Sequence, residues 1–144
     1  MRSLAPALML IIGVAVQFHG VATAREASIP RKVDEAAAER LAAEAVFGAH
    51  KLLEYFDYDE NISRTFTPPF LVFNGLSKPP AEGSFGFFAV NPWTGDVWNM
   101  WGCHRLSTPA SRKSQAEIRG RFTAEEMKQY AKLRQLKPEC TFED

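Results

Sequence analysis

The sequence predicts an α+β domain in which a long N-terminal helix packs on a small antiparallel sheet and two more helices follow. The first observation is an Ala-, Glu- and Leu-rich segment, Pro30 to about Phe56, whose apolar residues recur at three- and four-residue steps. The second is a pair of strand-like runs, Phe85–Val90 and Val97–Trp101, on either side of a turn. The third is two helix-capping patterns after Cys103.

The first 24 residues have the three parts of a secretory signal peptide. Arg2 gives a charged start, Leu8–Val16 is an apolar run, and Ala22-Thr23-Ala24 fits the A-x-A cleavage pattern. The apolar run is shorter than the roughly 20 residues that a membrane-spanning helix needs. We therefore expect residues 25–144 to be exported as one globular domain with no membrane span, to the periplasm of a bacterium or to the medium.

The composition argues against several classes of protein. The 144 residues are 46% hydrophobic and 24% charged, which is ordinary for one folded domain. The formal net charge of zero gives no basic excess for nucleic-acid binding. We therefore expect no nucleic-acid partner. None of the common nucleotide-binding or hydrolase motifs is present, so we also expect no cofactor.

Both cysteines, Cys103 and Cys140, lie in the predicted exported part, and two thiols there favour a disulfide. Two alternatives remain: a catalytic Cys103 beside His104, or a metal site formed by both cysteines with His50 and His104. Adjacent residues on a strand point to opposite faces, which disfavours a Cys103–His104 pair. The cysteine and histidine spacings match no zinc pattern, so we expect no metal and no catalytic residue.

The N-terminal half is predicted to hold the long helix, a loop and one strand. Pro30 suits a first helical turn, and the acidic residues that follow oppose the positive end of the helix dipole. Residues 57–69 are polar and end in Pro68-Pro69, which predicts a loop. The aromatic and β-branched run Phe70–Phe73 predicts a strand.

The hairpin gives the most detailed prediction. If the loop is Pro92–Gly95, Val90 faces Val97 and Phe88 faces Asn99. The sheet then has about three strands. Both faces of the hairpin are apolar; one carries Phe88, Val90, Val97 and Trp101, and the other Phe85, Phe87, Ala89, Trp98 and Met100. The hairpin is therefore either sandwiched between helices or presents one aromatic face to a ligand.

Two C-terminal helices are predicted from their caps. Thr108-Pro109 opens a polar, basic helix that runs to about Arg121. Thr123 and Glu126 form a capping box for a helix that runs to about Leu136.

The candidate binding residues are Trp93, Trp98, Trp101 and Arg105. Aromatic rings beside an arginine could bind a sugar, a peptide or a partner loop. Trp93 is the first choice as an exposed contact residue because it lies at the turn tip. Trp98 and Trp101 fall on opposite faces, so ordinary core packing is the main alternative for one of them.

Charged residues offer two weaker hypotheses. A basic run could bind an anionic partner, although a solvated helix face is the commoner explanation of such a run; it comprises Arg105, Arg112, Lys113, Arg119 and Arg121. Asp57, Asp59 and Glu60 could serve a small hydrolase that acts on peptides or cell wall, although solvated helix-end acids are the simpler explanation.

Phe87–Asn91 followed by Thr94–Trp98 resembles the strand, T-G turn and strand of PepSY-type small exported domains and of some NTF2-like immunity proteins. The resemblance implies a helix that packs across the sheet of the hairpin, and a periplasmic inhibitory or binding module. We therefore expect an exported, non-catalytic binding or inhibitor protein with a protein or cell-envelope partner. A small hydrolase and a structural accessory protein remain the alternatives.

Overall fold

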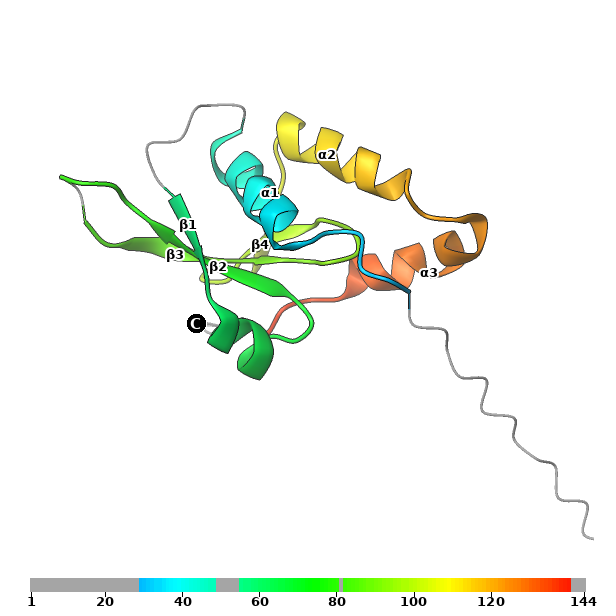
Figure 1. Ribbon diagram of the computed structural model, residues 1–144, viewed down its shortest axis with the longest axis horizontal. Helices are drawn as coiled ribbons and strands as arrows, with labels where there is room; N and C mark the ends of the chain where they lie inside the picture. Colours follow the sequence, from blue (N-terminus) through cyan, green and yellow to red (C-terminus); the bar gives the residue numbers. More distant parts are fainter. Residues whose placement is uncertain (1–28, 49–54, 81, 141–144) are drawn as a thin grey trace, which may run out of the picture.

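The computed structural model describes residues 29–48, 55–80 and 82–140. The predicted signal peptide and His50 lie outside these residues. Five antiparallel strands lie in the order β1-β2-β3-β4-β5, and three α-helices and one short π-helical segment pack around them (Figure 1). The α+β class and the order of its helices are as predicted.

Helix α1 (Glu35–Phe47) is shorter than the predicted helix at both ends. It begins after Asp34, whose side chain accepts a hydrogen bond from the backbone N–H of Ala37 at 2.8 Å. It ends at Gly48, which has a φ of 71°. Phe56, predicted as the last helical residue, belongs instead to β1 (Tyr55–Tyr58).

The predicted loop 57–69 was wrong in part, because it contains the end of β1 and the segment η1 (Ile62–Phe66). Ser63 fixes η1 to the sheet: its hydroxyl donates to the carbonyl of Asp59 at 2.7 Å and accepts from the N–H of Val72 at 2.8 Å. The backbone N–H of Asp59 donates to the carbonyl of Val72 at 2.8 Å.

Strands β2 (Leu71–Leu76), β3 (Ser84–Val90), β4 (Val97–Asn99) and β5 (His104–Leu106) complete the sheet. The sheet therefore has five strands where about three were expected. The predicted hairpin register is confirmed, with Val90 opposite Val97 and Phe88 opposite Asn99.

Phe85 lies on the face opposite to the predicted one. Gly75 pairs with Gly86 and Leu76 pairs with Ser84, so Phe85 is an extra residue in β3. This bulge turns the Phe85 ring toward α1, where it packs edge-on against Phe47 and Phe56.

Both faces of the hairpin are covered at its centre, although α-helices cover only one of them. On one face Phe88, Val90 and Val97 pack under α1 and α2 (Pro109–Arg119). On the other face a second apolar cluster joins the hairpin to η1 and to the segment after α3 (Ala124–Gln135); its members are Phe70, Val72, Ala89, Trp98 and Met100, with Ile62, Phe87 and Leu136 against it.

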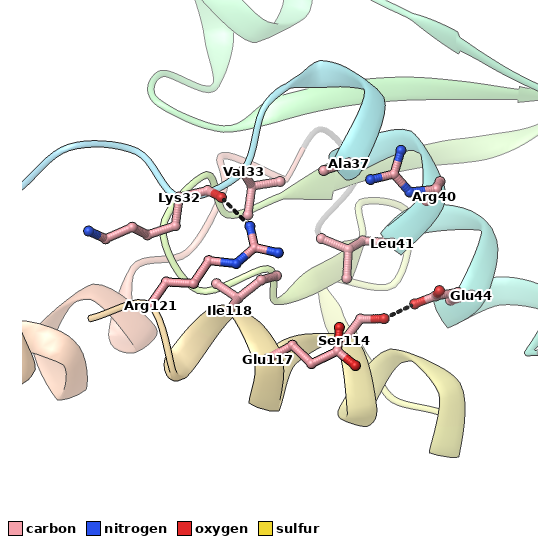
Figure 2. A pocket seen from close by; sticks show the side chains of 10 residues that line it. All are labelled: Lys32, Val33, Ala37, Arg40, Leu41, Glu44, Ser114, Glu117, Ile118 and Arg121. Carbon is pink, nitrogen blue, oxygen red and sulfur yellow. Dashed lines mark hydrogen bonds between the residues drawn. The ribbon is translucent and has the colours of Figure 1, made fainter. Parts of the chain in front are cut away.

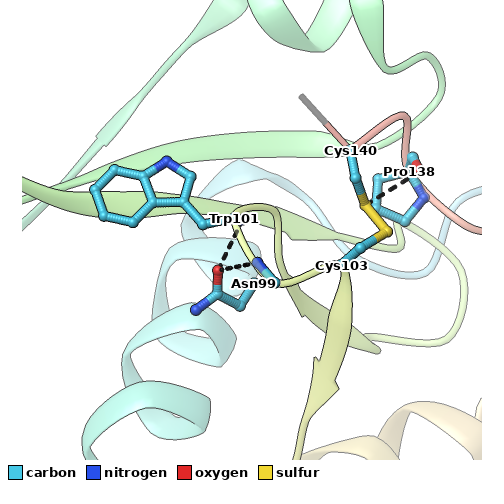
Figure 3. The surroundings of a disulfide bond; sticks show 6 residues. Asn99, Trp101, Cys103, Pro138 and Cys140 are labelled. Atoms are coloured by element: carbon cyan, nitrogen blue, oxygen red, sulfur yellow. Dashed lines mark hydrogen bonds between the residues drawn. A yellow bond between two sulfur atoms is a disulfide. The ribbon is translucent and has the colours of Figure 1, made fainter. Parts of the chain in front are cut away.

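The two C-terminal helices begin as predicted. Thr108 caps α2 with a capping box to Ser111, and Thr123 caps α3 with the predicted box to Glu126. The disulfide between Cys103 and Cys140 is also confirmed, with 5.6 Å between the Cα atoms (Figure 3). It ties the segment after α3 to the turn between β4 and β5.

Candidate functional site

Trp93 does not lie at an exposed tip. Its side chain is half-buried against the main core, and its Nε1 donates to the carbonyl of Ile29 at 2.8 Å. The N–H groups of Lys32 and Val33 both donate to the carbonyl of Pro92, at 2.9 and 3.0 Å. The N-terminal segment therefore crosses the turn, and the expectation that no core is available there was wrong.

The turn itself is a buried polar unit. The side-chain oxygen of Asn91 accepts from the N–H groups of Trp93 and Thr94, at 3.0 and 3.2 Å. The amide nitrogen of Asn91 donates to the carbonyl of Leu133 at 2.9 Å, which links the turn to α3. Asn91 thus holds the turn in shape and anchors α3.

Trp98 and Arg105 lie together and contact each other, although the Arg105 side chain is still 32% exposed. Trp98 is 5% exposed, and the guanidinium of Arg105 lies 4.9 Å from its ring centroid. Arg105 also lies 3.7 Å from the carboxylate of Asp96, and Arg134 of α3 lies 3.4 Å from it. This cluster braces β4, β5 and α3.

Trp101 is the candidate residue that the structure leaves accessible, with 46% of its surface exposed. It lies in the turn after β4, where its backbone N–H donates to the side-chain oxygen of Asn99 at 2.9 Å (Figure 3). A Cβ built on Gly86 would come within 4.0 Å of the indole, so Trp101 flanks the beginning of β3.

Tyr55 lies at the same end of the sheet and is 46% exposed. It pairs with Leu76 at the end of β2, and Leu76 pairs with Ser84 at the beginning of β3. We call Tyr55 and Trp101 the aromatic end of the sheet. Sequence reasoning missed Tyr55 because the apolar spacing there predicted a helix.

Phe66 is the third large apolar side chain of the described residues that is exposed, at 48%. It ends η1, which connects the end of β1 to the start of β2. Phe66 therefore lies toward the opposite end of the sheet from the aromatic end and offers a matched control for it.

The acidic residues considered for catalysis have structural partners or stand apart. Asp59 accepts from the N–H of Ile62 at 2.8 Å, and Glu60 forms an ion pair with Arg64 at 2.7 Å. Asp57 is exposed on β1 opposite Asn74. Cys103 carries no thiol because it is in the disulfide.

Across residues 29–48, 55–80 and 82–140, no group of three or more His, Cys, Asp or Glu side chains is placed to hold a metal ion. In the same ranges, no helix has the length and apolar character to cross a membrane.

Three arginines of the basic run contact neutral groups of the fold. Arg112 donates to Ser107 at 3.3 Å, Arg119 lies 5.4 Å from the ring centroid of Tyr130, and Arg121 donates to the carbonyl of Lys32 at 3.3 Å. Lys113 is exposed on α2.

Two side chains at the α3 interface have shifted pKa values. The hydrogen bond from Lys32 and that from the Thr123 N–H lower the pKa of Glu126. Partial burial, and then the negative charge of Asp96, raise the pKa of Tyr130. Both side chains belong to α3 and pack it against the rest of the domain, Glu126 through Lys32 and Tyr130 through Phe122.

Comparisons with known proteins identify a fold but no family. No family model matches the sequence, and no curated protein does so either. A similar solved structure is a type VI secretion system effector-immunity complex from Pseudomonas protegens, of which one chain is 22% identical to this one. The match covers 70% of this chain and 88% of that chain, with a TM-score of 0.50. At this identity the likeness shows that the two chains share a fold.

Proposed function

We propose that this chain is an exported inhibitor that binds a protein partner and catalyses no reaction of its own. The observation that carries the proposal is the fold shared with a chain of an effector-immunity complex. That complex joins an effector and an immunity protein. In this proposal the present chain takes the part of the immunity protein and inhibits a toxin delivered to the cell envelope.

The disulfide supports the location. Disulfides form and persist in oxidising compartments such as the periplasm. The Cys103–Cys140 bond holds the segment after α3 in place, and the N-terminal sequence has the pattern of an export signal. The inhibitor would therefore fold after export and meet its target there.

We assign the partner contact to the aromatic end. Trp and Tyr are the side chains that most often dominate binding energy at protein interfaces, since they bury a large area at low entropic cost. Trp101 and Tyr55 are each 46% exposed and belong to one end of the sheet. Trp93, Trp98 and Arg105 would act indirectly, by holding the hairpin and β5 in shape.

The test begins with capture of a partner by purified chain 25–144 from envelope and secreted proteins of the native host. The captured protein is then produced alone, its toxicity is measured in cells, and its affinity for the chain is measured by calorimetry. We expect the exported chain to relieve the toxicity. We also expect Trp101→Ala to weaken binding at least tenfold, about 1.4 kcal/mol.

Phe66→Ala is the matched control, because Phe66 is equally exposed toward the other end of the sheet. We expect it to change the affinity less than about twofold. The proposal is wrong if no protein is retained, or if the retained protein is not toxic or is not neutralised. Equal loss of affinity in both variants would contradict the assignment to the aromatic end.

A further inference from the structure

The outer edge of β1 carries backbone groups that point away from the sheet. β1 is the first strand of the sheet order and pairs with β2. The backbone N–H of Asp59, directly after β1, donates to the carbonyl of Val72 on β2 at 2.8 Å. Because hydrogen-bonded residues alternate along an antiparallel pair, Asp57 also directs its N–H and C=O toward β2. The N–H and C=O groups of Phe56 and Tyr58 therefore point outward.

These four groups have no partner in the part of the chain that the structure describes. No backbone or side-chain group there forms a hydrogen bond with the N–H or C=O of Phe56 or Tyr58. β1 lies in front of β2 and β3 in Figure 1, and no described helix passes over it. The edge is therefore open to a further strand.

The opposite edge of the sheet, β5, offers fewer backbone groups. The N–H of Met100 donates to the carbonyl of Phe87 at 3.0 Å, which fixes the alternation along β4. In the three-residue strand β5 this alternation leaves Arg105 as the residue whose N–H and C=O point outward. The Arg105 side chain already contacts Trp98 and the carbonyl of Arg134. β1 is therefore the better edge for a new strand.

The side chains of β1 make its two faces different. Phe56 is buried in the main core, and Tyr58 packs against that core from the same face. Tyr55 and Asp57 alternate with them and lie on the opposite face, where both are exposed. Asp57 forms no ion pair with a described residue, and its neighbour on β2 is the neutral Asn74. This face of the edge therefore carries an unpaired negative charge beside an aromatic ring.

Two arginines near the end of β1 do not neutralise this charge. Arg31 lines a hollow with Tyr58 and Glu35, on the face of the sheet that carries α1. Arg64 forms an ion pair with Glu60 at 2.7 Å. The charge of Asp57 thus stays available to a cation that arrives on a partner strand.

This charge decides between the possible occupants of the edge. An antiparallel strand that pairs with all four groups places the residue between its two hydrogen-bonded residues directly opposite Asp57. If a second copy of β1 pairs through the same four groups, that residue is also Asp57, and like charges directly opposite destabilise a pair of strands. A lysine or arginine there gains an ion pair, and its aliphatic stem can lie beside the ring of Tyr55.

We propose that a strand of the partner protein adds antiparallel to the outer edge of β1, with a lysine or arginine opposite Asp57. This inference rests on the proposed function for the source of the strand, and it extends the partner contact from Tyr55 along β1. Main-chain hydrogen bonds to Phe56 and Tyr58 supply affinity, and the charge of Asp57 selects the side chain. The edge itself can be tested without the partner.

The probe is the peptide acetyl-Thr-Val-Lys-Val-Thr-amide, titrated into chain 25–144 and followed by amide chemical shifts. Its two valines would lie opposite Phe56 and Tyr58, with its lysine opposite Asp57. At saturation we expect hydrogen exchange of the Phe56 and Tyr58 N–H groups to slow at least about tenfold.

Two matched peptides separate the charge from the backbone. The peptide with glutamate in place of lysine should bind about fivefold more weakly, because it places a like charge opposite Asp57. The lysine peptide N-methylated at both valines lacks the two donors that face β1. It should bind at least about tenfold more weakly, although its side chains are unchanged.

Variants of Asp57 test the charge from the side of the chain. Asp57→Asn, which keeps the shape of the side chain, should abolish the preference for the lysine peptide, and Asp57→Lys should reverse it. Glu117→Lys is the matched control: Glu117 is exposed on α2, where it lines a groove against α1 (Figure 2). α1 separates α2 from β1 in Figure 1, so the same charge change there should leave the preference in place.

Thermal unfolding of each variant shows whether the fold is retained. Asp57 is exposed, so its replacement spares the core. No binding of the lysine peptide, equal binding of the lysine and glutamate peptides, or a lysine preference that survives in Asp57→Lys would overturn the proposal. Full binding of the N-methylated peptide would overturn it too, since that peptide cannot donate to β1.

The partner from the capture experiment separates this inference from the proposed function. A neutralised toxin that binds wild type and Asp57→Lys equally, and leaves exchange at Phe56 and Tyr58 unchanged, shows that the edge assignment is wrong and the function right. A lysine-selective edge without any captured toxin shows the reverse.

Discussion

The guanidinium of Arg105 lies 4.9 Å from the ring centroid of Trp98 and donates through Nη2 to the carbonyl of Arg134 at 2.6 Å. Two residues whose types suggest ligand binding thus contact each other within the fold. Arg105 comes from β5, Trp98 from β4 and Arg134 from α3. The contact therefore fixes three elements around the buried carboxylate of Asp96.

Asp96→Ala should lower the free energy of unfolding by about 2 kcal/mol in urea titrations. The Asp96 side chain is 3% exposed and accepts from Thr94 at 2.7 Å, besides its pairs with Arg105 and Arg134. The loss stays below that of a fully buried pair because both arginines can turn to water. Glu125→Ala, an exposed residue of α3, should cost less than about 0.5 kcal/mol, and an equal effect of both changes would contradict the bracing role.

Local signals explain which elements the sequence predicts. The hairpin register follows from Pro92 and Gly95 in the turn, and the start of α3 follows from Thr123 and Glu126, all within a few residues. The disulfide follows from the predicted export of a chain with two cysteines. These features need no knowledge of the tertiary structure.

Distant contacts explain what the sequence does not predict. Trp93 is half-buried, and its indole Nε1 donates to the carbonyl of Ile29, 64 residues earlier. The short strands β1 and β5 have no pattern of their own and depend on their neighbours β2 and β4. Phe85 changes faces at a bulge opposite Gly75 and Leu76, which alternation cannot show.

Gly95→Ala should destabilise the fold more than Gly48→Ala does, although both glycines have a φ of 71°. A Cβ on Gly95 would lie 2.7 Å from Cδ1 of Ile118 and 3.1 Å from Cδ1 of Leu41, whereas a Cβ on Gly48 meets nothing within 4 Å. We expect about 1 kcal/mol for Gly48→Ala from backbone strain, and about 3 kcal/mol for Gly95→Ala from strain plus overpacking. Urea titration of both variants measures this, and equal losses would contradict the close packing of the turn.

Loss of the disulfide should lower the free energy of unfolding by roughly 4 kcal/mol, because the bond closes a loop between residues 37 apart. The double variant Cys103→Ser and Cys140→Ser should unfold at a lower urea concentration, and wild type with reductant should match it. Reductant should not affect the double variant, which makes that measurement the control. A loss below about 1 kcal/mol would show that Leu136 and Pro138 hold the C-terminal segment without the bond.

The ion pair between Lys32 and Glu126 should make stability fall in acid. Lys32 and the Thr123 N–H each donate to the Glu126 carboxylate at 2.8 Å, and they hold its pKa below the ordinary value of 4.5. A carboxyl group whose pKa is lower in the folded chain stabilises the fold above its unfolded pKa, and this contribution is lost as the pH falls through the folded value. We therefore expect wild type to exceed Glu126→Gln in free energy of unfolding at pH 7, and the gap to narrow below pH 4.5.

Urea titrations from pH 7 to about pH 3 measure the gap. Glu125→Gln, one residue earlier and exposed, is the matched control, and a gap that stays constant with pH would contradict the role of the Glu126 charge.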